Sequence, residues 1–95
     1  MVVGVGSFDL FIPEVHSLKE KRSVVRKIVQ RVKNQFEMSV AEVDSLDLHQ
    51  KATIGFALVT NDGRLADSLL NKVINFVEAL HLAQITRVNL EVIHV

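Results

Sequence analysis

The chain has 95 residues, of which 48% are hydrophobic and 23% are charged. This balance is ordinary for a globular protein and argues against intrinsic disorder, and the length fits a single domain, residues 1–95, with one core. The sequence contains no cysteine, which excludes disulfides, zinc–cysteine sites and thiol catalysis.

Basic residues are distributed very unevenly along the chain. Eleven basic and eleven acidic residues give a formal net charge of zero. Seven of the basic residues lie in the segment 16–36, whose only acid is Glu20, so this segment carries a net charge of +6 and the rest of the chain −6. The neutral total therefore hides a strongly dipolar molecule.

The first predicted element is a strand over Val2–Ile12. Phe8 and Leu10 alternate with more polar neighbours, and this period of two is typical of a strand that packs one face against a core. Gly4 and Gly6 lie on the same face as these apolar residues. Their lack of a side chain predicts that a bulky group packs closely over the sheet there.

A helix is predicted to begin after Ser17. Ser17 and Glu20 have the spacing of a capping box, in which each side chain satisfies a free amide at the start of a helix. Apolar residues then recur at helical spacing and form one stripe. That stripe consists of Leu18, Val25, Ile28, Val29, Val32 and Phe36.

The second half of the chain is predicted to repeat this architecture. A short strand over Met38–Asp44 and a longer strand over Lys51–Thr60 come first. Asn61 or Asp62 then caps a second amphipathic helix. The last predicted strand covers Gln84–Val95, where apolar and polar residues alternate.

The order β-α-β-β-α-β predicts an α+β fold, the ferredoxin-like plait, in which a four-stranded antiparallel sheet carries both helices on one face. The other face of the sheet is then uncovered. Strand alternation places small and apolar residues on it, and exposed apolar patches commonly mark interaction sites. We therefore expect a homodimer interface formed by Val3, Val5, Phe11, Ala57 and Val59, with Met38 and Val40 beside it.

Basic residues dominate the polar side of the first helix. Two interpretations stay open: an ordinary solvated helix face, or a surface that contacts phosphates. Like charges at i,i+4, as in Arg22 and Arg26, destabilise a helix slightly, and acidic partners are almost absent. These features favour polyanion binding, with RNA first. The candidate RNA-binding residues are Lys19, Lys21, Arg22, Arg26, Lys27 and Lys33.

No group of residues predicts catalysis or a metal site. Glu42 and Asp44, two apart on one strand, are typical of an exposed strand surface, and no histidine lies at metal-ligand spacing. The apolar N-terminal run is too short for a membrane span and lacks the basic flank of a secretion signal. We expect a cytoplasmic protein that is not an enzyme, with no catalytic residues, metal, cofactor, small-molecule substrate or membrane contact.

Three segments together resemble the YlxP-like family of small bacterial proteins, a domain of unknown function (DUF503). They are HSLKEKRSVVRKI at 16–28, SVAEVD at 39–44 and LHQKATIGFALVTND at 48–62. The resemblance implies a ferredoxin-like fold and no established activity. Because members are often encoded beside translation-initiation and ribosome-maturation genes, it also implies RNA or ribosomal components as partners. His49 stands where the family pattern leads us to expect tryptophan.

Overall fold

The structure is a computed structural model that describes all residues, 1–95. Its elements confirm the order β-α-β-β-α-β. They are β1 (Val2–Phe11), α1 (Leu18–Gln35), β2 (Ser39–Asp44), β3 (Lys51–Thr60), α2 (Gly63–Leu80) and β4 (Gln84–His94).

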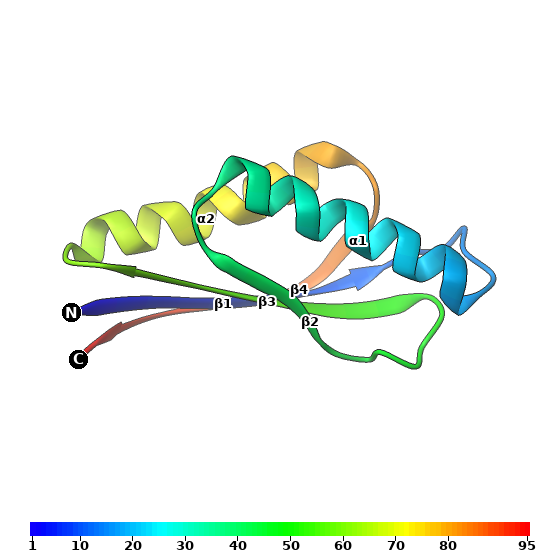
Figure 1. Cartoon of the computed structure of the whole chain (residues 1–95), viewed down its shortest axis with the longest axis horizontal. Coiled ribbons are helices and arrows are strands. Elements are labelled where there is room, and N and C mark those ends of the chain that lie inside the picture. Colours follow the sequence, from blue (N-terminus) through cyan, green and yellow to red (C-terminus); the bar gives the residue numbers. More distant parts are fainter.

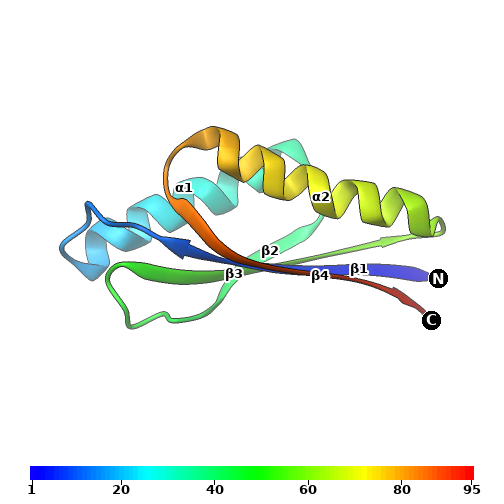
Figure 2. The same cartoon turned by 180° about the vertical axis from the view of Figure 1, so that it is seen from behind.

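The four strands form one sheet in the order β2-β3-β1-β4, and all neighbouring strands are antiparallel. Both helices lie on the same side of this sheet, and its other side is uncovered (Figure 1). The view from behind shows the same two layers (Figure 2). The predicted ferredoxin-like plait is therefore confirmed. Neither helix combines the length and the hydropathy that crossing a membrane requires.

The core lies between the helices and the sheet, and the even-numbered residues of β1 and β3 supply its lower layer. Phe8 and Phe56 pack there with ring centroids 5.8 Å apart. A Cβ atom on Gly6 would lie only 2.8 Å from the Cε1 and Cε2 atoms of Phe56. The glycine therefore makes room for the ring, which confirms the predicted close packing over this face of β1.

The ends of the helices are fixed by local contacts. Asp62 caps α2, because its Oδ1 atom accepts a hydrogen bond of 2.9 Å from the Arg64 amide. His81 closes α2 in the left-handed region, with φ of 52°. Phe36 at the end of α1 packs edge-on against Phe76 of α2, and the ring centroids are 5.6 Å apart. This contact joins the two helices above the sheet.

Each edge strand carries one irregularity. In β2, Glu42 pairs with Ile54 and Asp44 with Thr53, so that Val43 is an inserted residue. In β4, the register against β1 shifts after Asp9. A bulge of this kind changes which side chains share a face of the sheet.

Candidate nucleic-acid interface

The start of α1 is set by the predicted capping box. The Ser17 hydroxyl accepts a hydrogen bond of 3.1 Å from the Glu20 amide. The Glu20 carboxylate in turn accepts one of 3.3 Å from the amide of His16, the residue before the cap. These contacts hold the first turn in place, and they fix the rotation of the helix over the sheet together with the buried side chains.

The buried side of α1 consists of Lys21, Val25, Ile28 and Val32. All the other basic residues of the helix are exposed. We call them the basic face: Lys19, Arg22, Arg26, Lys27, Arg31 and Lys33. From the first to the last, this surface extends roughly 21 Å along the helix at 1.5 Å per residue.

The basic face is not neutralised by the protein itself. The only salt bridge in the structure joins Lys21 to Glu42, and it does not involve the face. None of the six exposed side chains has a carboxylate within ion-pair distance. Their positive charges therefore add up to a positive potential over this side of the helix, in a molecule whose other charged residues are mainly acidic.

The middle of the basic face is hollowed. Ser23, Gln30 and Asn34 are its neutral residues, and the Gln30 amide donates a hydrogen bond of 2.9 Å to Asn34. The cationic side chains of Arg26, Lys27 and Arg31 complete a hollow of about 300 Å³ that no hydrophobic residue lines. Multiple donors around a small anion are the usual means of holding a phosphate group. Sequence reasoning left out Arg31, although its position one turn after Lys27 was the signal.

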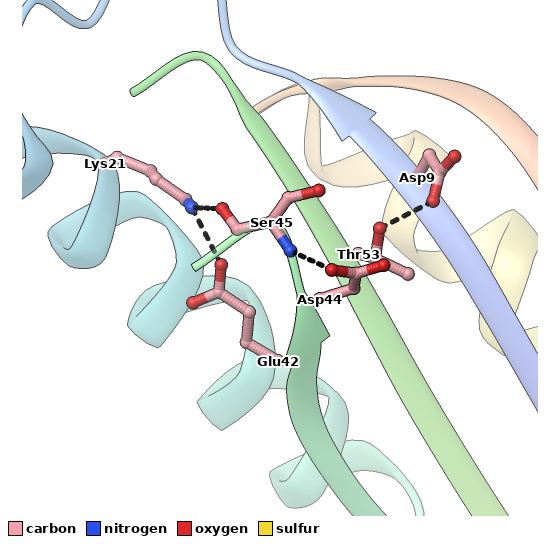
Figure 3. Close-up of polar contacts among 6 residues, drawn as sticks. All are labelled: Asp9, Lys21, Glu42, Asp44, Ser45 and Thr53. Atoms are coloured by element: carbon pink, nitrogen blue, oxygen red, sulfur yellow. Dashed lines mark hydrogen bonds and ion pairs between the residues drawn. The ribbon is translucent and has the colours of Figure 1, made fainter. Parts of the chain in front are cut away.

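Lys21 does not belong to the basic face, which corrects its assignment as an RNA-binding residue. Its side chain is fully buried. The ammonium group donates a hydrogen bond of 2.6 Å to the Ser45 carbonyl and lies 2.8 Å from Glu42 Oε2 (Figure 3). This carboxylate oxygen is buried and has no other partner. Lys21 therefore connects α1 to the end of β2 and is part of the fold.

The uncovered side of the sheet carries the five residues predicted to form an interface. Val5, Phe11 and Val59 are exposed, and Val3 and Ala57 are half-buried. Cross-strand pairs place Val3 opposite Val59 and Val5 opposite Ala57, so they form one patch. Phe11 pairs with Lys51 at the far end of β1, beyond Ser7 and Asp9, and lies apart from this patch. We call the five predicted positions together the open face: Val3, Val5, Phe11, Ala57 and Val59.

One of the two neighbours that the sequence predicted for the open face is wrong, because Val40 pairs with Phe56 and is buried. Met38 packs partly against the core and also lines a surface hollow with Val3, Ala57 and Val59. The bulged residue Val43 lies on the open side instead, where its side chain covers Gly55 and is 57% exposed. The register of β2 turns Val40 and Glu42 toward the helices.

Comparison with known sequences identifies the family of the chain. The profile of the family described as "Protein of unknown function (DUF503)" matches residues 3–90. The chain belongs to this family. It is also 31% identical over 78 residues to the "Uncharacterized protein YlxP" of Bacillus subtilis (strain 168), an alignment that covers 82% of this chain and 85% of that protein. The DUF503 match includes all of α1, β2 and β3, so both the basic face and the open face lie in the shared domain.

In this DUF503 chain Glu42 and Asp44 do not share a strand face, although their spacing predicted that they would. The bulge at Val43 separates them: Glu42 turns toward α1, whereas Asp44 lies opposite Thr53 on the uncovered side (Figure 3). There, Thr53 donates a hydrogen bond of 2.8 Å to Asp9. Nowhere do three histidine, aspartate or glutamate side chains come together in a way that could hold a metal ion.

Proposed function

We propose that the protein is a non-enzymatic, cytoplasmic binding module that contacts the phosphates of structured RNA through the basic face of α1. The observation that carries this proposal is the set of six exposed cationic side chains without a carboxylate partner. Helix stability alone does not account for it, because like charges at i,i+4 destabilise a helix and interspersed glutamates would remove the repulsion. A role linked to the ribosome is consistent with the translation-related gene neighbourhood described above for the family.

The hollow between Arg26, Lys27 and Arg31 supports phosphate groups as the moiety contacted. A surface of cations without an aromatic ring favours contacts with phosphates over stacking on aromatic side chains. The proposed interaction is therefore with the backbone of folded RNA. The hypothesis assigns the affinity mainly to Lys19, Arg22, Arg26, Lys27 and Lys33, with Arg31 added from the structure.

Binding to an rRNA hairpin should depend steeply on salt. Three or four phosphate contacts predict a slope of about −3 when the logarithm of the association constant is plotted against that of the salt concentration. Changing both Arg22 and Arg26 to glutamate should reduce the magnitude of the slope by about two, because each lost phosphate contact contributes about one. Fluorescence anisotropy with a labelled hairpin measures both quantities.

The matched control reverses two charges elsewhere. Arg64 and Lys72 are exposed on α2, so changing both to glutamate alters the net charge by the same amount without touching α1. We expect this control to retain the wild-type slope. A binding constant that does not vary with salt, or equal losses in the two double variants, would contradict the proposal.

A second candidate function is a homodimeric protein–protein interaction module that uses the open face and has no nucleic-acid role. Val59 is 68% exposed and lies opposite Val3, and Val43, further along the same side of the sheet beside Gly55, is 57% exposed. Such exposure is large for apolar side chains on a sheet. A second copy is the proposed partner, because a formal net charge of zero provides little repulsion between identical molecules.

Changing Val59 to aspartate should dissociate such a dimer, because it would bury an unpaired charge in the apolar contact. Sedimentation velocity at about 50 μM, a range suited to small interfaces, measures the dimer fraction. Changing the exposed Asn75 on α2 to aspartate adds the same charge away from the open face and should have no effect. A dimer that persists in the Val59 variant would exclude the open face as its interface.

A further inference from the structure

The edge strand β4 is unusually poorly covered. It is the longest strand of the sheet, with 11 residues, and none of them is buried. By contrast, β3 buries every second residue from Ala52 to Leu58. The free edge of β4 presents unpaired backbone amides and carbonyls, which can pair with a strand of another molecule.

The side chains in the middle of β4 are self-complementary. Pairing with β1 places Arg87, Asn89 and Glu91 on the uncovered side of the sheet and Val88 and Leu90 on the helix side. Opposite charges thus stand two residues to either side of Asn89, and apolar residues stand one residue to either side. An antiparallel strand related by a two-fold axis at Asn89 would meet each of them with its complement.

We propose that two copies of this chain pair along β4 in antiparallel orientation, with Asn89 opposite Asn89 of the second copy. Arg87 then faces Glu91 of the second copy, and Val88 faces its Leu90. The two sheets become one continuous sheet of eight strands. This contact uses the edge of the sheet and is independent of RNA binding and of the open face.

Arg87 and Glu91 form no ion pair within one molecule, so both are available for this contact. Arg87 lies opposite Asp9 on β1, but Asp9 accepts a hydrogen bond from Thr53, and no salt bridge joins Asp9 to Arg87. Glu91 lies opposite Val5, which offers no charge. Each charge therefore lacks a partner within the molecule and gains one in the pair.

The register of the pair is selected by the same residues. A shift by two residues in one direction would place Arg87 opposite Asn89, and a shift in the other direction would place it opposite Ile93, so both lose the charge pairs. A shift by one residue would place helix-side residues of one copy opposite uncovered-side residues of the other, so the helices of the two copies would lie on opposite sides of the joined sheet. The other edge strand, β2, is short and interrupted by the bulge at Val43, which protects it from similar pairing.

The partner is a second copy for two reasons. Edge strands that avoid association often carry lysine, and an identical edge then repels them. In β4 one charge of each sign stands two residues from Asn89, so an identical antiparallel edge is attracted. A contact this short is at the small end of protein interfaces, so we expect a salt-sensitive dimer that dissociates in the micromolar range.

Charge reversal and restoration test the proposal. Changing Arg87 to glutamate places like charges opposite each other twice, and we expect the dimer dissociation constant to rise roughly tenfold or more in sedimentation experiments. Changing Glu91 to arginine in the same chain restores opposite charges in the pair, and the dissociation constant should return to within about threefold of wild type. Circular dichroism checks that each variant is folded.

Three results would overturn the proposal: a wild-type protein that is monomeric at about 100 μM, which exceeds the expected dissociation constant; an Arg87→Glu variant that dimerises as wild type does; or a folded double variant that stays monomeric. Arg64→Glu is the control, because it makes the same charge change on α2 and should leave the dimer intact. A dimer lost in the Val59→Asp variant but kept in Arg87→Glu would assign association to the open face and also reject the edge.

Discussion

Changing Lys21 to methionine should lower the free energy of unfolding by about 3 to 5 kcal/mol. The substitution keeps an unbranched side chain of similar length but removes the ammonium group. It leaves the Glu42 carboxylate, whose side chain is only 15% exposed, without its partner, and the Ser45 carbonyl without its donor. Because small domains are stable by only about 5 to 15 kcal/mol, this loss should be plain in urea denaturation.

Two controls assign the loss to the buried ion pair. Changing Glu42 to leucine in the Lys21→Met variant removes the stranded charge and should recover most of the stability, because apolar replacements of buried ion pairs are often neutral. Changing the exposed Lys27 to methionine should alter the free energy of unfolding by less than about 0.5 kcal/mol. The Lys27 variant should instead weaken RNA binding. A Lys21→Met variant as stable as wild type would contradict the structural role of Lys21.

Changing Gly6 to alanine should destabilise the protein by about 3 kcal/mol, the upper part of the range for overpacked cores. The new methyl group would press into the Phe56 ring, which is buried and packs against Phe8. Because the ring is buried and in contact with Phe8, the strand or the aromatic pair must shift. Thermal and urea unfolding measure the effect.

The same substitution on the opposite side of the sheet provides the control. A Cβ atom on Gly55 would lie 3.0 Å from Val43, whose side chain is exposed and can move. Gly55→Ala should therefore be neutral or slightly stabilising, because glycine is unfavourable inside a strand. Changing Phe56 to leucine should recover part of the stability of Gly6→Ala, since the two sites are in contact. Equal effects at Gly6 and Gly55 would contradict this account.

The fold could be predicted because the strands and helices depend on residues that are close together in the sequence. The alternation around Phe8 and Leu10 and the capping residues Ser17 and Glu20 all depend on neighbours within a few positions. The order of elements then leaves few topologies available to a chain of this length. Even the requirement for glycine at position 6 was predictable, although the identity of the ring above it was not.

The predictions for the site were wrong where the position of a side chain depends on residues that are distant in the sequence. Lys21 has the spacing of a buried residue, four positions before Val25 and seven before Ile28. A lysine is expected on the surface because of its charge. Only the position of Glu42, which the fold brings close, explains the burial of Lys21. Likewise, the sequence of β2 does not reveal the bulge at Val43, because a bulge is a relation between two strands. The exposure of the other basic residues of α1 needed no such partner, and their helical spacing was enough to predict it.

The position of β1 between β3 and β4 has a consequence for the order in which the chain assembles. Val2 pairs with His94 and Phe11 with Gln84, so one side of this inner strand is completed only by β4, the last of the four strands in chain order. Contacts between such distant segments close large loops before they contribute energy, which slows folding relative to helical proteins of similar size. Three of the four strands precede β4 in the chain, so we expect a sheet of β2, β3 and β1 that is completed when β4 pairs with β1.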